Sequence, residues 1–233
     1  MRVLVTRPIE DAKETERVLR EHGHEAFIEP LLEVIFFDGP QIQLTATQAI
    51  LATSANGVRA LSRRTSRRDL PLFAVGPQTA ESARAAGFTS VRSADGDATA
   101  LAHAVANWTT PEKGPLLHVS GAEGEGRLAK ALSASGFVVR TEYLYEVRPV
   151  SGLSVAVGDA LKGASLDAVL LFSPRSAGVF RDLVQHTGLG THASKLIGVC
   201  ISDAAAAALA PLKLLEVRVA KRPNQSALLD CLG

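Results

Sequence analysis

The chain has 233 residues, of which 46% are apolar and 21% are charged, so it can form one large or two small domains with buried cores. Its 25 Lys and Arg residues against 24 Asp and Glu residues give a formal charge of +1. With so small a net charge, the protein has no overall electrostatic field that would attract a nucleic acid or an anionic membrane. One basic run, from Ser62 to Asp69, follows a predicted helix, and we interpret it as a solvated loop.

Little in the sequence indicates a metal site or export. Cys200 and Cys231 are too few for a metal cluster, and Cys200 lies in an apolar run where a thiol acts as a small hydrophobic group. The six histidines include no pair at helical ligand spacing with nearby acids. The first residues turn polar too soon for a signal-peptide core or a membrane span. We therefore expect a cytoplasmic protein without a metal, a nucleic-acid partner or a membrane anchor.

In the first half of the chain, apolar runs without polar alternation predict buried strands, and helical spacing predicts helices between them. The expected elements are a strand at Val3–Val5, a helix from Pro8 to Leu19, a strand at Ala26–Ile28, an extended segment at Glu29–Phe37, a strand at Ile50–Ala52, a helix through Val58 and Leu61, a strand at Leu72–Val75, a helix at Ala80–Ala86, a brief strand at Val91 and a helix through Leu101 and Val105. Thr109 to Gly114 has turn composition.

The second half repeats this pattern. The expected elements are a strand at Leu116–Val119, a helix from Arg127 to Leu132, a strand at Phe137–Val139, an extended segment at Tyr143–Val147, a helix at Val155–Leu161, a strand at Ala168–Phe172, a helix from Ser176, a strand at Leu196–Cys200, a helix at Ala204–Leu209, a strand at Leu215–Val219 and a last helix. Strands alternating with helices predict an α/β fold of doubly wound, flavodoxin-like parallel sheets with helices on both faces.

A fixed offset relates the two halves. Gly136 lies 113 residues after Gly23, and Val147 lies 113 residues after Val34. An offset shared by a helix end and a following strand indicates an internal duplication. The later elements keep the same order while their offset drifts from 119 to 127 residues, as insertions would cause.

Leu31–Val34 and Leu144–Val147 both read Leu-x-Glu-Val. We interpret them as the two passages of the chain between two domains, with linkers near residues 34–38 and 146–150. One domain is then discontinuous, 1–34 with 150–233, and the other is the inserted segment 37–146. A ligand is expected beside the passages, in the cleft. Tyr143 and Tyr145 have the same parity on an extended segment, so both are expected on one side.

Small hydroxyl residues and glycines follow the predicted strands. The carboxyl ends of parallel strands are where ligands bind, and free N–H groups at helix starts bind anions. The candidate binding residues are Thr6, Arg7, Thr53, Ser54, Gly76, Thr79, Ser120, Gly121, Arg127, Ser173, Pro174, Arg175 and Ser202. Each alone is better explained by a helix cap or a solvated arginine. Together they favour a ligand with several carboxylates or phosphates.

The chain lacks a nucleophile–base pair, a metal-binding motif and a dinucleotide fingerprint. The glycine-rich turn from Ser120 to Gly126 also lacks the lysine of a phosphate-binding P-loop. If the protein is an enzyme, its active site would act through its shape and its electrostatics rather than through a reactive side chain. The phenol of Tyr145 could donate a hydrogen bond to a leaving oxygen, or it could pack at a hinge.

The motifs taken together resemble the uroporphyrinogen-III synthase family over almost the whole chain. They are Val3–Pro8, Ala52–Val58, Ala74–Ala80, Ser120-Gly121 with Gly126-Arg127, Leu144–Glu146 and Phe172–Pro174. The resemblance implies a monomeric lyase with two α/β domains joined by a two-stranded ladder. It also implies closure of hydroxymethylbilane, a linear tetrapyrrole with eight carboxylates, to uroporphyrinogen III. Water is lost and ring D is inverted, with no metal or cofactor.

By motif match, Tyr145 takes the place of the family's tyrosine near the leaving hydroxyl, and Thr79 that of a threonine in its Gly-x-x-Thr turn. Ser54, Gly76, Ser120 and Ser173 would offer backbone amides to carboxylates. Where the family often has a second turn of this kind, the chain has Ile201 to Ala204, whose Asp203 brings negative charge or caps its helix.

Two other function classes stay open from the sequence. One is a catalytically inactive, synthase-like module that binds a polycarboxylate in a regulatory role, which dehydration activity would distinguish. The other is a two-domain binding protein of transport type, which predicts export and is opposed by the polar start of the chain.

Overall fold

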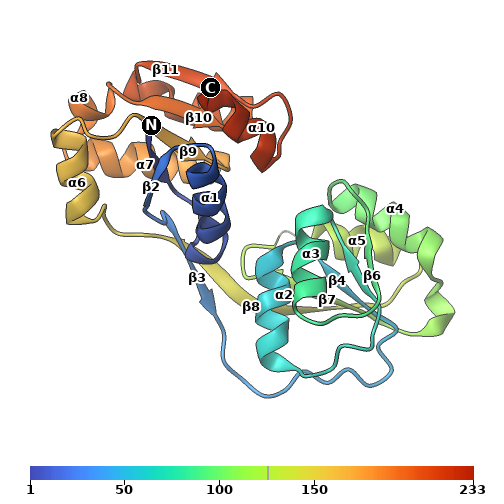
Figure 1. The fold of residues 1–233 in the computed structure, drawn as a ribbon. Coiled ribbons are helices and arrows are strands. Elements are labelled where there is room, and N and C mark those ends of the chain that lie inside the picture. The colour runs from blue at the N-terminus through green and yellow to red at the C-terminus, as the bar shows by residue number, and fades with distance from the viewer. Residues whose placement is uncertain (125) are drawn as a thin grey trace. The chain divides into compact units, whose positions relative to one another are not determined.

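The computed structural model describes residues 1–124 and 126–233. The chain divides into two compact units. Unit 1 contains Met1–Glu33 and Arg148–Gly233, and unit 2 contains Val34–Val147. Figure 1 shows a sheet flanked by helices in each unit, which confirms the prediction of an α/β fold.

Unit 1 is built on a five-stranded sheet in the order β11-β10-β9-β1-β2, in which every neighbouring pair is parallel. Its strands are β1 (Arg2–Val5), β2 (Glu25–Ile28), β9 (Ala168–Leu171), β10 (Ile197–Cys200) and β11 (Glu216–Val219). Its helices are α1 (Ile9–Glu21), α6 (Val155–Lys162), α7 (Pro174–His186), α8 (Gly190–Ala193), α9 (Asp203–Leu209) and α10 (Gln225–Leu229), with short 3-10 turns at Ala210–Leu212 and Asp230–Leu232.

Unit 1 has two hydrophobic cores, one on each face of its sheet, because successive side chains of β1 point to opposite faces. Val3 and Val5 pack with α1 and α10 on one face of the sheet, through residues such as Leu19 and Leu228. Leu4 packs on the other face with α6, α7, α8 and α9, where Phe180 is fully buried. Since both faces are covered, the central strands β1 and β9 carry unbroken apolar runs at Val3–Val5 and Ala168–Leu171.

Unit 2 is built on a six-stranded sheet in the order β3-β8-β7-β4-β5-β6. Its strands are β3 (Leu32–Phe36), β4 (Ala49–Ala52), β5 (Leu72–Ala74), β6 (Val91–Ser93), β7 (Leu116–Gly121) and β8 (Val139–Pro149), and β8-β7-β4-β5-β6 are parallel. Its helices are α2 (Ala55–Arg64), α3 (Pro77–Ala85), α4 (Ala98–Trp108) and α5 (Arg127–Ala134), with a 3-10 turn at Pro111–Lys113.

The chain passes between the units within β3 and β8. Phe37 N–H donates to Leu144 O (2.8 Å), whereas Val150 N–H donates to Leu31 O (3.1 Å). The partners run in opposite order, so the two strands are antiparallel.

Unit 2 has its own pair of hydrophobic cores, one on each face of its sheet. Ile50 and neighbouring residues pack against α2 and α3 on one face, and Leu51 packs against α4 and α5 on the other.

The two sheets share one spatial arrangement but differ in chain order. The unit 1 sheet, β2-β1-β9-β10-β11, has the flavodoxin-like order 2-1-3-4-5, whereas the unit 2 sheet, β8-β7-β4-β5-β6, reads 5-4-1-2-3, a circular permutation of that order. The order reverses between β1 and β9 in unit 1 and between β7 and β4 in unit 2. The carboxyl ends of the strands at such a reversal form the usual ligand crevice. The internal duplication stays a prediction.

Three details of the predicted elements were wrong. The predicted strand at Phe137–Val139 overlaps β8 only at Val139, and the segment at Tyr143–Val147 belongs to the same long strand. The short helix α8 was not predicted, and α7 begins at Pro174 rather than at Ser176. A proline suits the first helical position because its missing N–H has no partner there in any helix.

The expectation that Tyr143 and Tyr145 share a side was also wrong. Tyr143 is 49% exposed, whereas Tyr145 is 7% exposed. Ser120 pairs with Tyr143 but Gly121 pairs with Tyr145, so the register shifts by one residue between them. An irregularity of this kind, a β-bulge, reverses the side to which the following residues point.

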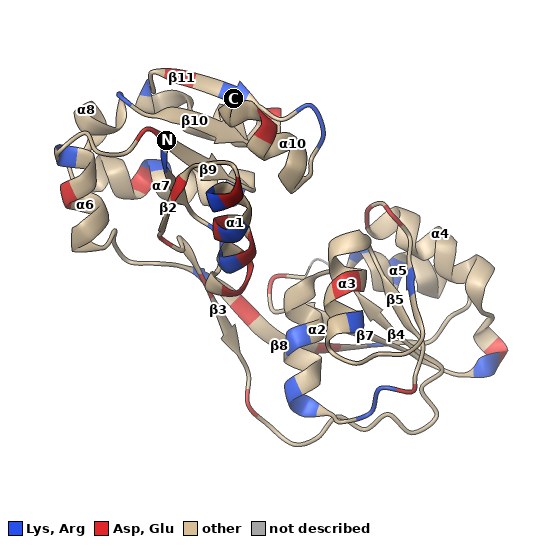
Figure 2. Cartoon of the chain, viewed as in Figure 1, with Lys and Arg blue, Asp and Glu red and all other residues tan. Residues whose placement is uncertain are grey.

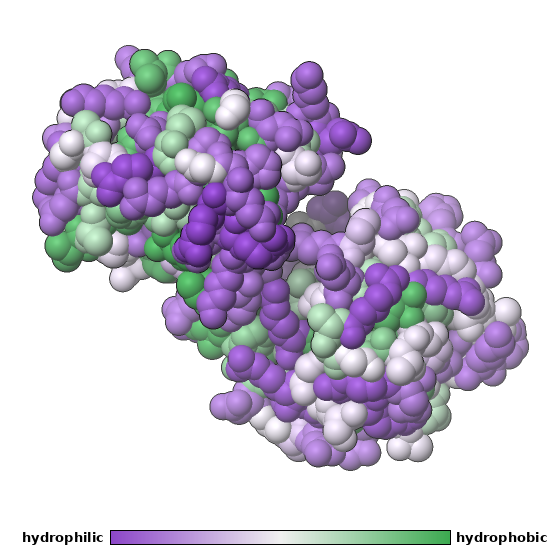
Figure 3. All heavy atoms as spheres, viewed as in Figure 1, coloured by the Kyte–Doolittle hydropathy of each residue, from purple (hydrophilic) through white to green (hydrophobic). Residues whose placement is uncertain are grey.

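Charged residues of both signs mix on the surface. Figure 2 shows them interleaved along α1, where Arg17 pairs with Glu14 (2.6 Å) and Arg20 with Glu16 (2.9 Å). Polar residues dominate the face drawn in Figure 3, with apolar residues interspersed. Among residues 1–124 and 126–233, no helix is both long and apolar enough to cross a bilayer.

Candidate functional site

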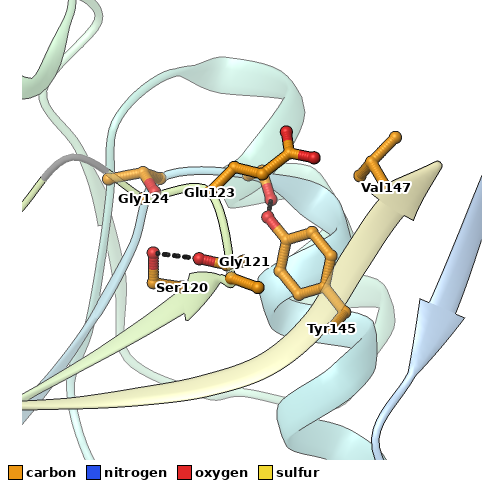
Figure 4. Close-up of a pocket in the computed structure, with 9 residues that line it drawn as sticks. Ser120, Gly121, Glu123, Gly124, Tyr145 and Val147 are labelled. Carbon is orange, nitrogen blue, oxygen red and sulfur yellow. Dashed lines mark hydrogen bonds between the residues drawn. The ribbon is translucent and has the colours of Figure 1, made fainter.

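A cavity of about 230 Å³ lies in unit 2, where the strand order reverses between β7 and β4. Five of the predicted site residues line it, namely Thr53, Ser54, Ser120, Gly121 and Tyr145. Ala122, Glu123, Gly124 and Val147 complete its wall, and Figure 4 shows the Tyr145 ring beside Gly121 with the Glu123 carboxylate near its hydroxyl. The carboxyl ends of β4 and β7 therefore border the cavity, as expected of a ligand site in a parallel sheet.

Ser54 is held by the start of α2. It is the N-cap residue, with an extended backbone, and its Oγ accepts from the Gly57 N–H (3.1 Å). A Cβ added at Gly57 would lie 3.2 Å from Val119 O, so glycine lets the first turn of α2 approach β7 closely. The same Ser54 Oγ lies 2.7 Å from the Tyr145 hydroxyl.

Tyr145 is buried on the α2 face of the sheet, and its ring lies 6.5 Å from that of Phe36. Burial raises the pKa of the Tyr145 phenol above its ordinary value, the hydrogen bond with Ser54 opposes this, and the Glu123 carboxylate adds to the rise. The phenol therefore keeps its proton at neutral pH. It can donate a hydrogen bond to an oxygen in the cavity but is not poised as a base.

The sequence did not single out Glu123 or its neighbours Ala122 and Gly124. They belong to the turn that follows β7, and Gly124 N–H donates to Gly121 O (2.9 Å). This tight turn holds the Glu123 side chain over the strand ends. In the sequence, the one signal that could have indicated this part of the site was the run of alternating glycines and acidic residues after a predicted strand.

Three predicted residues of unit 2 do not line the cavity. Gly76 is the N-cap of α3, and Thr79 is buried in the first turn of that helix. Arg127 is the first residue of α5, with an exposed side chain.

In unit 1, two candidates at the end of β1 contact their own unit. The Thr6 hydroxyl is buried and donates to Leu170 O (2.6 Å), which ties β1 to β9. The Arg7 guanidinium donates to Gln225 Oε1 (2.6 Å), stacks over Phe172 at 4.4 Å and lies 3.6 Å from the Asp11 carboxylate.

The other unit 1 candidates lie at helix starts. Ser173 forms a capping box with Ser176, Pro174 begins α7, and Arg175 follows it with an exposed side chain. Ser202, not Asp203, caps α9 and accepts from Ala205 N–H (3.4 Å), while Asp203 is the first helical residue. In the part of the chain that the structure describes, no three His, Cys, Asp or Glu side chains gather as metal ligands.

Comparisons with known proteins assign the chain to a family. The family model described as "Uroporphyrinogen-III synthase HemD" matches residues 13–230. The chain belongs to this family. The comparison with curated proteins gives no match.

Solved structures with the same fold include the uroporphyrinogen-III synthetase from Helicobacter pylori, at 16% identity and a TM-score of 0.63, covering 100% of this chain and 98% of that one. A mutant uroporphyrinogen III synthase from the extremely thermophilic bacterium Thermus thermophilus is similar at 16% identity and a TM-score of 0.50, covering 100% and 97%. Family membership gives this synthase its reaction, a cyclising dehydration that converts hydroxymethylbilane to uroporphyrinogen III with inversion of ring D.

Proposed function

We propose that the cavity between the ends of β4 and β7 receives the end of the substrate that carries the leaving hydroxyl, and that Tyr145 donates a hydrogen bond to that hydroxyl. The observation that carries this proposal is the buried, protonated phenol among small residues at a strand-order reversal. Loss of hydroxide places negative charge on the departing oxygen. A phenol held in a cavity stabilises that charge as it develops.

Cyclisation itself requires little further chemistry from side chains. Hydroxide leaves ring A to give an azafulvene, ring D attacks it through a spiro intermediate, and fragmentation with reclosure inverts ring D. Unassisted closure gives the uninverted isomer, so the enzyme contributes mainly by holding the substrate folded. The hydroxyls and backbone groups that line the cavity suit this holding role.

Carboxylates of the substrate are expected at the helix starts of unit 2. The charge of Glu123 opposes them at the start of α2, whose Ser54 lines the same cavity, but not at the start of α3, which is outside the cavity lining. The N-terminus of α2 begins at Ser54, and that of α3 begins at Gly76 with Thr79 in its first turn. Backbone N–H groups and the positive end of the dipole favour anions at both.

Several finer features of the protein belong to the same proposal. We infer that it acts as a monomer in the cytoplasm on an eight-carboxylate tetrapyrrole, without a nucleic-acid partner. Two domains with limits at 1–34 plus 150–233 and at 37–146 fit the two compact units. Burial raises the pKa of the Cys200 thiol to about 11, so this thiol stays protonated at neutral pH.

Product binding tests where the ligand lies. When uroporphyrinogen III is titrated into isotope-labelled protein, the amide resonances of Thr53, Ser54, Gly121 and Ala122 are expected to shift together and to saturate. Citrate, a small polycarboxylate, serves as a control for unspecific anion binding. Saturable shifts that exclude all four amides would show that the product binds elsewhere.

A further inference from the structure

We propose that Ser54 and Gly121 are positioning residues that fix the hydroxyl of Tyr145, with Ser54 donating to the phenolic oxygen so that the proton of the phenol points to the substrate. This inference rests on the proposed role of Tyr145 and adds two residues that act through it.

The hydrogen bonds of Ser54 set the direction of donation. A hydroxyl has one proton and two acceptor positions, and the Gly57 N–H already occupies one acceptor position of Ser54 Oγ at 3.1 Å. The Tyr145 oxygen is its other partner, at 2.7 Å. The Gly57 N–H lies at the positive end of α2 and begins a series of hydrogen bonds. The bonds of such a series strengthen one another when each group donates in the same direction. Ser54 then donates to Tyr145, and the phenol keeps its own proton for a third group.

The backbone of Gly121 fixes the ring. A Cβ added there would lie 3.0 Å from two ring carbons of Tyr145 and 3.3 Å from its hydroxyl oxygen, closer than carbon atoms normally pack. Glycine is needed at this position for space, so that the ring can lie against the turn after β7 (Figure 4). The side chain is therefore confined by Gly121 and by the hydrogen bond to Ser54. Confinement matters because misplacing a reacting group by about 1 Å can cost a hundredfold in rate.

The chain offers a direct way to observe the phenol. It contains two tyrosines, so in a Tyr143→Phe background every tyrosine signal belongs to Tyr145. Tyr143 is half exposed and lies outside the cavity lining. A donor to the phenolic oxygen stabilises the phenolate, so losing that donor raises the pKa of Tyr145. The tyrosinate absorbance measures this pKa, and the resonance of the labelled phenol carbon at neutral pH reports the same bond without exposure to alkali.

In that background, Ser54→Ala is expected to raise the pKa of Tyr145, to move the phenol carbon resonance and to lower kcat by about threefold to tenfold, the effect of one hydrogen bond. Ser54→Thr keeps a hydroxyl and should restore all three. Ser154→Ala is the matched control, since Ser154 caps α6 by the same bond to Val157 N–H but lies in unit 1. Gly121→Ala, which removes no polar group, should lower kcat by up to about a hundredfold.

An unchanged phenol carbon resonance in Ser54→Ala would overturn the assignment of Ser54, whatever the rate does. An unchanged kcat in Gly121→Ala would overturn that of Gly121. If Ser54→Ala moves the resonance while both Ser54→Ala and Tyr145→Phe turn over normally, the hydrogen bond exists but the proposed role of Tyr145 in the reaction is wrong. The two failures are thus distinguishable.

Discussion

Replacing Tyr145 by phenylalanine is expected to slow turnover by roughly tenfold to a thousandfold. The phenol would only assist the departure of hydroxide, so its loss costs less than the largest general-acid effects. The ring remains packed near Phe36 and within the α2-side core, and one hydrogen bond to Ser54 is lost. That bond contributes about 1 kcal/mol, so the variant should stay folded.

Initial rates at saturating hydroxymethylbilane measure this effect. Tyr143→Phe is the matched control because it removes the same hydroxyl from an exposed side chain two residues away, and it should keep the wild-type rate. The slow variant should also yield a larger share of the uninverted isomer, since spontaneous closure competes. A Tyr145→Phe enzyme with unchanged kcat would remove the phenol from the mechanism.

Acidification is expected to destabilise unit 2 through His118, lowering its free energy of unfolding by about 2 kcal/mol between neutral pH and about pH 5. His118 is 4% exposed on β7, and neither ring nitrogen has a hydrogen-bond partner among the described residues. It alternates with Leu117 and Val119, so it faces the core beneath α4 and α5, where Leu51 and Thr141 are its neighbours on adjacent strands.

Burial lowers the pKa of His118 from 6.5 to about 4, and this sets the direction in which the free energy of unfolding changes with pH. As the pH falls through 6.5, the unfolded chain takes up a proton that the folded chain refuses until about pH 4. Protons therefore favour the unfolded form in that window. The stability is fully present above the unfolded pKa and is lost below it.

Urea unfolding followed by the fluorescence of Trp108 reports on the right unit, because this single tryptophan lies on α4 and packs against Phe73. His118→Leu should abolish the histidine part of the pH dependence and keep or increase stability at neutral pH. His103→Leu, on an exposed position of α4, is the control for losing one imidazole. Equal pH dependence in His118→Leu and the wild type would refute this origin.

Much of the fold follows from local patterns. Strands such as Ile50–Ala52 were predictable because a strand covered on both faces must be apolar throughout, and helix starts such as Ser54 were predictable from their capping side chains. The bulge in β8 was not predictable from the sequence. A one-residue shift in strand pairing depends on the neighbouring strand, and no particular residue type indicates it. It decides that Tyr145 is buried and Tyr143 exposed.

The cavity depends on long-range order. Ser54 and Tyr145 are 91 residues apart, and they meet because β7 lies between β4 and β8 in the sheet. Alternating strands and helices predict parallel sheets but not which strands are neighbours. The position of Glu123 likewise depends on how the turn after β7 folds back over Gly121. The role proposed for Tyr145 came from the resemblance to the family, and the structure shows which residues contact it.

The isomer that the protein produces tests the whole account most directly. Freshly generated hydroxymethylbilane is fed to the purified protein, the products are oxidised, and the type I and type III isomers are separated by chromatography. We expect type III in large excess in the wild type, with a growing share of type I when Tyr145→Phe slows the enzyme. Type I alone, formed at the spontaneous rate by the wild-type protein, would contradict the account.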